Sequence, residues 1–198
     1  MKYLFFFITI LLLPVMATSQ DDIAYQEFFA DISETPETYE AHTVAGRMVE
    51  GLGFRFYWGT HDLSDEDYLF KPTEDTRGIG ETLDHILGLS DMILNAVHGR
   101  PNGASDHGEI DYHAKRLLVL KNLYQARSVL MAASDGDMDE MGIIFKRGDS
   151  ERKFDFWYAI NGPISDSLWH VGQIVSYRRM AGNPFNGKVS VLSGTVRN

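Results

Sequence analysis

The chain has 198 residues, of which 44% are hydrophobic and 23% charged, and its net charge is −10 with neutral histidines. This length suits one globular domain with a proper core, and the balance of residue types excludes a disordered protein. The acidic charge gives no electrostatic support to nucleic-acid binding. The absence of cysteine excludes disulfides, a zinc ribbon and a thiolate nucleophile.

The first 19 residues have the pattern of a cleavable signal peptide. Lys2 supplies a positive charge, residues 4–13 are uncharged, and small residues at 17–19 suit a cleavage site. The apolar run is about half of the roughly 20 residues that span a bilayer, and Pro14 ends it. We therefore expect a bacterial protein exported to the periplasm or the medium, with residues 1–19 removed and no stable membrane insertion afterwards.

The rest of the chain divides into a lead-in at 20–35, a helical body at 36–184 and a tail at 185–198. The lead-in contains a short acidic and aromatic segment that favours one short helix. Within the body, hydrophobic residues recur every three or four positions over four segments, as in helices packed against a core. These helices are expected at about 36–58, 79–98, 111–133 and 163–181. Their connections exceed tight turns, so the expected fold class is all-α, a four-helix bundle with at least one crossover.

Smaller elements are also expected between and within these helices. Pro36 and Pro163 suit first-turn positions of the first and last long helices, where proline is tolerated. Ser64 and Asp67 have the spacing of a capping arrangement for one short turn. Residues 143–157 contain two short hydrophobic runs separated by Arg-Gly-Asp-Ser, which predicts a β-hairpin.

The last predicted helix carries a polar stripe. Asp166 and His170 stand four positions apart and leave the same face, and Gln173 and Tyr177 continue the stripe. Hydrophobic residues on the opposite side indicate a helix between neighbours, so we expect the stripe to face other protein. A carboxylate and an imidazole inside the protein need partners, and a divalent metal ion would serve both. The basic pair at 178–179 is expected to interact with the dipole at the end of the same helix.

His85 lies in the second predicted helix, away from the main apolar face and in line with Glu81. We expect it between packed surfaces as well. Glu81, one turn before it, is a candidate fourth ligand or base, although a solvated charge is the commoner state for such a residue. A lone histidine of this kind is more often a satisfied interior residue than a ligand. Its importance depends on the Asp166–His170 pair.

Two segments carry a family resemblance. Residues 70–94 read FKPTEDTRGIGETLDHILGLSDMIL, and residues 168–184 read LWHVGQIVSYRRMAGNP. They resemble the DinB/YfiT-like superfamily of metal-binding four-helix bundles, and the resemblance extends over about 38–184. Members typically place one histidine in the second helix and a His-x-x-x-His pair in the last, followed by Gly-Gln-Ile and a basic pair.

The resemblance implies a metal site with His85 as the first ligand and His170 as the last. Asp166 stands where the common pattern has a histidine, so the implied site has two histidines and one carboxylate. Such a set suits a divalent transition metal (Zn, Ni, Fe or Mn) with open positions for water or substrate. Glu81, Gln173 and Tyr177 are the candidates to support it. Family activities include thiol-dependent transferases and isomerases and thiol-linked hydrolases.

Two interpretations stay open at this stage. The first is an exported metal-dependent enzyme of thiol-transferase or hydrolase type that acts on a small molecule. The second is a non-catalytic helical module, possible as a homodimer, in which a buried His/Asp network only fixes the register of the helices. The two differ in whether metal raises the stability of the folded state.

Overall fold

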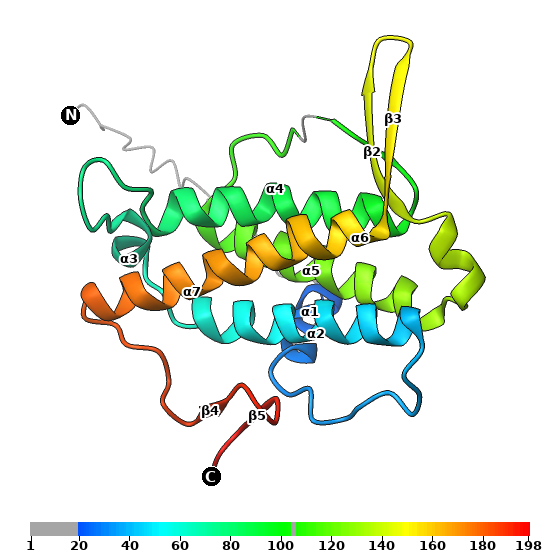
Figure 1. The fold of residues 1–198 in the computed structure, drawn as a ribbon. Coiled ribbons are helices and arrows are strands. Elements are labelled where there is room, and N and C mark those ends of the chain that lie inside the picture. Colours follow the sequence, from blue (N-terminus) through cyan, green and yellow to red (C-terminus); the bar gives the residue numbers. More distant parts are fainter. Residues whose placement is uncertain (1–19, 104–105) are drawn as a thin grey trace, which may run out of the picture.

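The computed structural model describes residues 20–103 and 106–198. Residues 1–19, the expected signal peptide, lie outside this part of the chain. The body is a bundle of four long helices: α2 (Ala41–Thr60), α4 (Ile79–Val97), α5 (Tyr112–Ala132) and α7 (Ser165–Met180). Helix α7 lies between α2 and α4 on the face shown in Figure 1, and α5 packs against both from behind. Over the described residues, the structure has no helix that is both long enough and apolar enough to cross a bilayer.

The core fills the space between these four helices. Its largest fully buried side chains are Phe29, Leu52, Phe54, Phe56, Ile79, Leu83, Ile86, Ile93, Leu120, Leu123, Leu130 and Ile164. Each large apolar side chain contributes on the order of 1.5–3 kcal/mol when it leaves water. The short helix α1 (Gln20–Phe28) packs against α5, and α3 (Asp65–Leu69) connects α2 with α4. The expected short turn is confirmed, because the Ser64 hydroxyl accepts from the Asp67 N–H and the Asp67 carboxylate accepts from the Ser64 N–H.

Three of the four predicted long helices begin and end close to the expected residues. The first does not, since α2 begins at Ala41 and the chain around Pro36 is not helical. Thr43 explains this start: its hydroxyl oxygen accepts from the Glu40 N–H at 3.0 Å, and the hydroxyl also contacts the carbonyl oxygen of Thr38 at 3.0 Å. A side-chain cap at this point outweighs the weaker preference of proline for a first turn.

Pro163 also lies elsewhere than expected, inside a helical run. A short helix α6 (Phe156–Ala159) and a π-helical turn η2 (Ile160–Ile164) lead directly into α7. Gly162 has φ −86° and ψ −105°, so the run is kinked immediately before the proline. Proline removes one backbone donor and clashes with the preceding turn, and the kink accommodates both effects. Both η2 and α7 contact α4.

The all-α expectation is wrong in part, because two small sheets accompany the helices. The predicted hairpin is confirmed: β2 (Gly142–Arg147) pairs antiparallel with β3 (Ser150–Asp155), and β1 (Pro101–Asn102) adds in parallel to β2. Gly142 is required there, since a Cβ would lie 2.3 Å from the carbonyl oxygen of Phe154. The hairpin projects beyond the bundle (Figure 1). In the tail, β4 (Val189–Ser190) pairs with β5 (Thr195–Val196).

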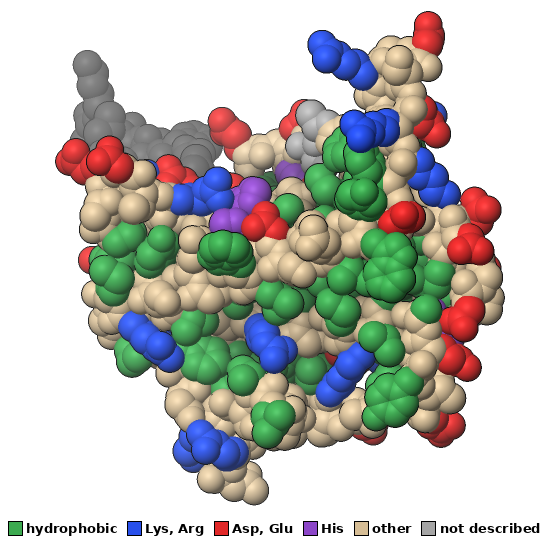
Figure 2. Space-filling model, in the orientation of Figure 1, with side chains coloured by type: hydrophobic (Ala, Val, Ile, Leu, Met, Phe, Trp, Pro, Cys, Tyr) green, Lys and Arg blue, Asp and Glu red, His purple; other side chains and the backbone are tan. Residues whose placement is uncertain are grey.

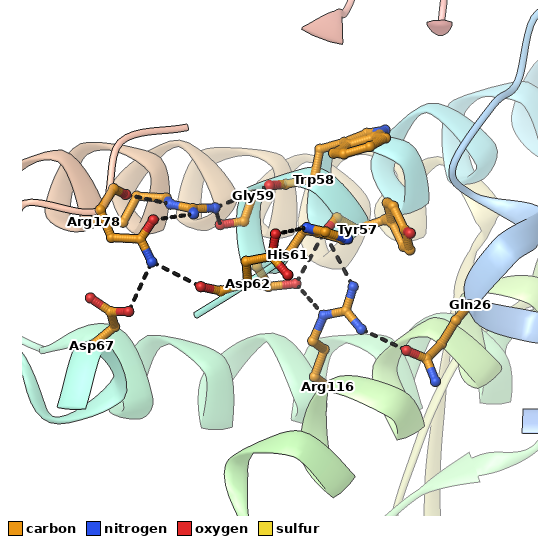
Figure 3. A network of polar contacts seen from close by, with 11 residues as sticks. Gln26, Tyr57, Trp58, Gly59, His61, Asp62, Asp67, Arg116 and Arg178 are labelled. Atoms are coloured by element: carbon orange, nitrogen blue, oxygen red, sulfur yellow. Dashed lines mark hydrogen bonds and ion pairs between the residues drawn. The ribbon is translucent and has the colours of Figure 1, made fainter. Parts of the chain in front are cut away.

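Two arginines close the C-terminal end of α2 (Figure 3). Arg178 is 3% exposed and donates from Nη1 to the carbonyl oxygens of Trp58 and Gly59, at 3.2 and 3.1 Å. Arg116 donates to the carbonyl oxygen of Tyr57 at 3.3 Å and to the Thr60 hydroxyl at 2.9 Å. Arg178 therefore serves the carbonyl end of α2 and not, as expected, only the dipole of its own helix. This network fixes α7 against α2.

Candidate metal centre

The line along which α4 meets α7 brings together three side chains from distant parts of the sequence. His85 projects from the first half of α4, and Asp166 and His170 project from the first two turns of α7. Asp166 Oδ2 lies 3.2 Å from His85 Nε2, and Asp166 Oδ1 lies 3.3 Å from His170 Nε2. One atom from each residue falls within 4.8 Å of the other two. The three residues named from the sequence therefore do converge, and they are called the triad below.

The spacing of the triad fits the requirements of one metal ion. Two ligand atoms at right angles around an ion with bonds of about 2.0–2.2 Å lie about 3 Å apart. Both carboxylate–imidazole distances, 3.2 and 3.3 Å, are close to this value. The imidazole rings meet edge to face, with centroids 4.6 Å apart and planes at 89°. Two histidines and a carboxylate form a donor set that divalent transition metals accept.

The triad is open to solvent on one side, and this corrects the expected burial. The side chains of His85 and Asp166 are 36% and 41% exposed, whereas that of His170 is 13% exposed. Figure 2 shows histidine and acidic side chains at the surface above the contact of α4 with α7. The hydrophobic residues of α4 and α7 face the core, so the polar stripe lies along the outer edge of their contact. A site of this kind is reachable by a small molecule without any opening of the bundle.

Gln173 holds the imidazole of His170 in a defined orientation. Its Oε1 lies 2.7 Å from His170 Nδ1 and accepts a hydrogen bond, which places the ring proton on Nδ1. On the other side of the ring, His170 Nε2 lies 3.3 Å from Asp166 Oδ1. A proton on Nε2 or a cation shared by the two atoms makes this approach favourable. The orientation of a ring by a hydrogen bond to its far nitrogen is the usual arrangement behind a metal-bound histidine.

The other two supporting candidates are placed differently. The carboxylate of Glu81 accepts from Lys71 Nζ at 2.7 Å and from the N–H of Gly78 at 2.9 Å, at the beginning of α4. The hydrogen bond from Lys71 is the largest cause of the lowered pKa of Glu81. Glu81 is thus engaged in the helix start. Tyr177 is two turns beyond His170 and packs against the hydrophobic core. Among the described residues no hydrogen bond joins either side chain to the triad.

Sequence reasoning missed a second histidine–carboxylate pair on α4. His107 Nε2 lies 2.7 Å from Asp91 Oδ2, and the amide nitrogen of Asn122 donates to Asp91 Oδ1 at 2.8 Å. This pair attaches the connection after β1 to the bundle. The triad spacing of four residues within a helix was visible in the sequence. His107 and Asp91 are sixteen positions apart and in different elements, so no periodic pattern links them.

No protein-family model matches the chain, and no curated protein matches it either. Among solved structures, the chain is similar to the crystal structure of the DinB-like protein YjoA from Bacillus subtilis. The two are 16% identical, the similarity covers 80% of this chain and 92% of the other, and the TM-score is 0.44. The description of that protein as DinB-like names the same superfamily to which residues 70–94 and 168–184 show a resemblance.

Proposed function

We propose that His85, Asp166 and His170 bind a divalent transition metal ion and form the centre of a metal-dependent enzyme of hydrolase or thiol-transferase type. The observation that supports this most is the convergence of one donor atom from each of the three side chains within 4.8 Å of the other two. A metal ion between these atoms would take one donor atom from each of the three side chains. Zn, Ni, Fe and Mn are all compatible with two imidazoles and one carboxylate.

Each residue of the proposed site has its own role in holding the ion. Asp166 supplies the negative charge that favours a cation, and Gln173 holds the proton of His170 on Nδ1. His85 comes from another helix, so the ion can only be held when α4 and α7 are packed together. When bound, such a metal lowers the pKa of a coordinated water or thiol and polarises a substrate oxygen. The exposed side of the triad leaves room for that small molecule.

The metal proposal is tested on purified, chelator-treated protein. Titration with Zn²⁺, Ni²⁺, Fe²⁺ and Mn²⁺ is followed by calorimetry and by thermal melting, because a ligand bound only to the folded state raises the melting temperature. We expect one ion per chain, and loss of binding in His85→Ala and His170→Ala. His113→Ala is the matched control, since His113 is 60% exposed and pairs with Asp65 outside the triad. Metal binding that survives both triad substitutions would contradict the proposal.

A non-catalytic module is the second candidate, and one contact favours it. The hydrogen bond between His85 Nε2 and Asp166 Oδ2 joins α4 to α7 without any metal. In that case chelators leave the melting curve unchanged, and His85→Ala lowers stability equally with and without added metal. Export by residues 1–19 and a homodimer belong to either candidate as expectations. Cell fractionation and sedimentation of the purified protein test them.

A further inference from the structure

A groove lies on the opposite side of α7 from the triad, between α2, α7 and the tail hairpin β4–β5. Its volume is about 320 Å³, and hydrophobic side chains of Ile32, Met48, Leu168, Val191 and Leu192 form most of its wall. Two arginines, Arg47 and Arg55, complete it. A volume near the lower end of the usual range for ligand pockets suits a small molecule.

The guanidinium of Arg55 carries a charge that the protein does not neutralise. It donates to the carbonyl oxygens of Gly51 and Val191, at 2.8 and 3.3 Å. Within the described part of the chain no carboxylate forms an ion pair with it. Burial and the positive charge of nearby Arg47 both lower the pKa of Arg55, so its surroundings disfavour the charge that it carries.

The neighbouring charges do not supply the missing anion. Arg47 pairs with Glu50, and the same carboxylate also pairs with Arg127 at 3.0 Å. Glu50 is 3% exposed, so one buried negative charge is shared by two arginines while Arg55 has none. Figure 2 shows this face of the molecule: basic side chains are spread among hydrophobic ones, and acidic side chains gather toward its edges. A cationic spot in a chain of net charge −10 is complementary to an anionic ligand.

The hydrophobic wall of the groove indicates that the ligand also has an apolar part. Leu192 is 96% exposed and Val191 is 49% exposed, and both stand at the groove beside the partly buried Met48 and Leu168. Exposed apolar surface next to a pocket gains free energy when a hydrocarbon covers it. A purely polar anion would leave this wall in water, and a neutral lipid would leave Arg55 without a partner.

We infer that the groove binds a small anionic amphiphile, with its carboxylate or phosphate on Arg55 and Arg47 and its hydrocarbon against Met48, Leu168 and Leu192. The source is a free fatty carboxylate or an alkyl phosphate, and both share this chemistry. Since the groove uses no residue of the triad, it binds whether or not the triad holds a metal.

The test is calorimetric titration of the full chain with decanoate and with decyl phosphate, each below its micelle concentration. We expect saturable binding of one molecule per chain and at least tenfold weaker binding of decanol, which lacks the charge. Arg55→Gln is expected to weaken binding of the anions about tenfold, the effect of one lost charged contact. Arg179→Gln is the matched control, because Arg179 is exposed on α7 outside the groove, and it should bind as the unaltered chain does.

Gly51→Leu keeps both arginines and tests the groove itself. A Cβ at Gly51 would lie 3.2 Å from Arg55 Nη1, so a leucine there fills the space beside this guanidinium and shifts it by a few tenths of an ångström, while it improves helix propensity. We expect it to abolish binding and to leave the protein folded. Equal affinity for decanol and decanoate, or unchanged affinity in Arg55→Gln or Gly51→Leu, would overturn the inference. So would binding only to vesicles that contain phosphatidylglycerol, because a membrane surface and not the groove would then be the partner.

Discussion

Helix α7 makes two polar contacts with its neighbours, and they differ in how completely they are satisfied. At its C-terminal end, Arg178 is buried and makes four hydrogen bonds, two to α2 and two to Asn183. At its N-terminal end, Asp166 and His170 are partly exposed, and Asp166 Oδ1 lies 3.3 Å from His170 Nε2. A buried side chain with four hydrogen bonds is well satisfied as a structural element. The triad, with three donor atoms close together and partly open to solvent, is where a ligand is expected.

The largest effect on stability is expected at the C-terminal end of α7, where Arg178 is buried and hydrogen-bonded. Arg178→Ala removes a buried side chain and leaves the carbonyl oxygens of Trp58 and Gly59 without donors. We expect a loss of about 3 kcal/mol in the free energy of unfolding, since unsatisfied buried polar groups and cavities each cost 1 kcal/mol or more. Urea denaturation measures it. A loss as large from His170→Ala in metal-free protein would remove the distinction between the two ends.

Tyr68 gives a second test of a buried polar group, through the effect of alkaline pH on stability. It is 2% exposed, its hydroxyl has no hydrogen-bond partner within the described residues, and burial raises its pKa to about 12. The unfolded chain loses this proton near pH 10 while the folded one keeps it, so stability is retained below pH 10 and lost as pH rises toward 12. Two pH units correspond to about 2.7 kcal/mol. The unfolding free energy of Tyr68→Phe should fall less over this range, and an equal fall would contradict the prediction.

Gln173→Leu breaks the orientation of His170 without removing a ligand. Loss of the hydrogen bond to Nδ1 frees the ring to rotate and to exchange its proton between the two nitrogens. Metal affinity is expected to fall about 10- to 100-fold, as for other residues that orient a metal-bound histidine. Calorimetric titration measures the affinity. Metal-free stability should change little, and Ser176→Ala, one turn along on the exposed side of α7, is the control.

The smallest effect is expected at Gly88, one turn from His85 on α4. A Cβ there would meet no atom within 4 Å. Gly88→Ala should raise the unfolding free energy by about 0.8–1 kcal/mol through helix propensity alone. Since the site is open on this side, metal affinity should stay the same. A fall in affinity would mean that the rim of the triad is more crowded than its exposure indicates.

Much of the fold, and part of the triad, could be predicted from the sequence because these features depend on local periodicity. The hydrophobic spacing gave α4 and α5 almost to the residue, and the four-residue step from Asp166 to His170 placed two triad members on one face. The convergence of His85 with them was expected from a resemblance and not from spacing. Its partners are 81 and 85 positions away in the sequence, and only packing decides which faces of two helices meet.

What could not be predicted depends on three-dimensional surroundings. Whether the polar stripe of α7 faces the core or its outer edge follows from the rotation of α7 against α4, which the periodicity of one helix does not fix. Arg178 was assigned to its own helix because the end of α2 lies 120 positions earlier in the chain. The role proposed for Arg55 could not be predicted from the sequence, since an arginine on a helix is ordinarily solvated and only the structure shows its neighbours.

The most direct measurement is anomalous X-ray diffraction from crystals of the protein loaded with Zn²⁺, Ni²⁺, Fe²⁺ or Mn²⁺, at the absorption edge of that metal. The open triad should hold one ion, with a single peak about 2.0–2.2 Å from His85 Nε2, His170 Nε2 and one oxygen of Asp166. Crystals without a peak between these three atoms, grown at metal concentrations that saturate the protein in solution, would show that the ion binds elsewhere and that the triad only joins two helices.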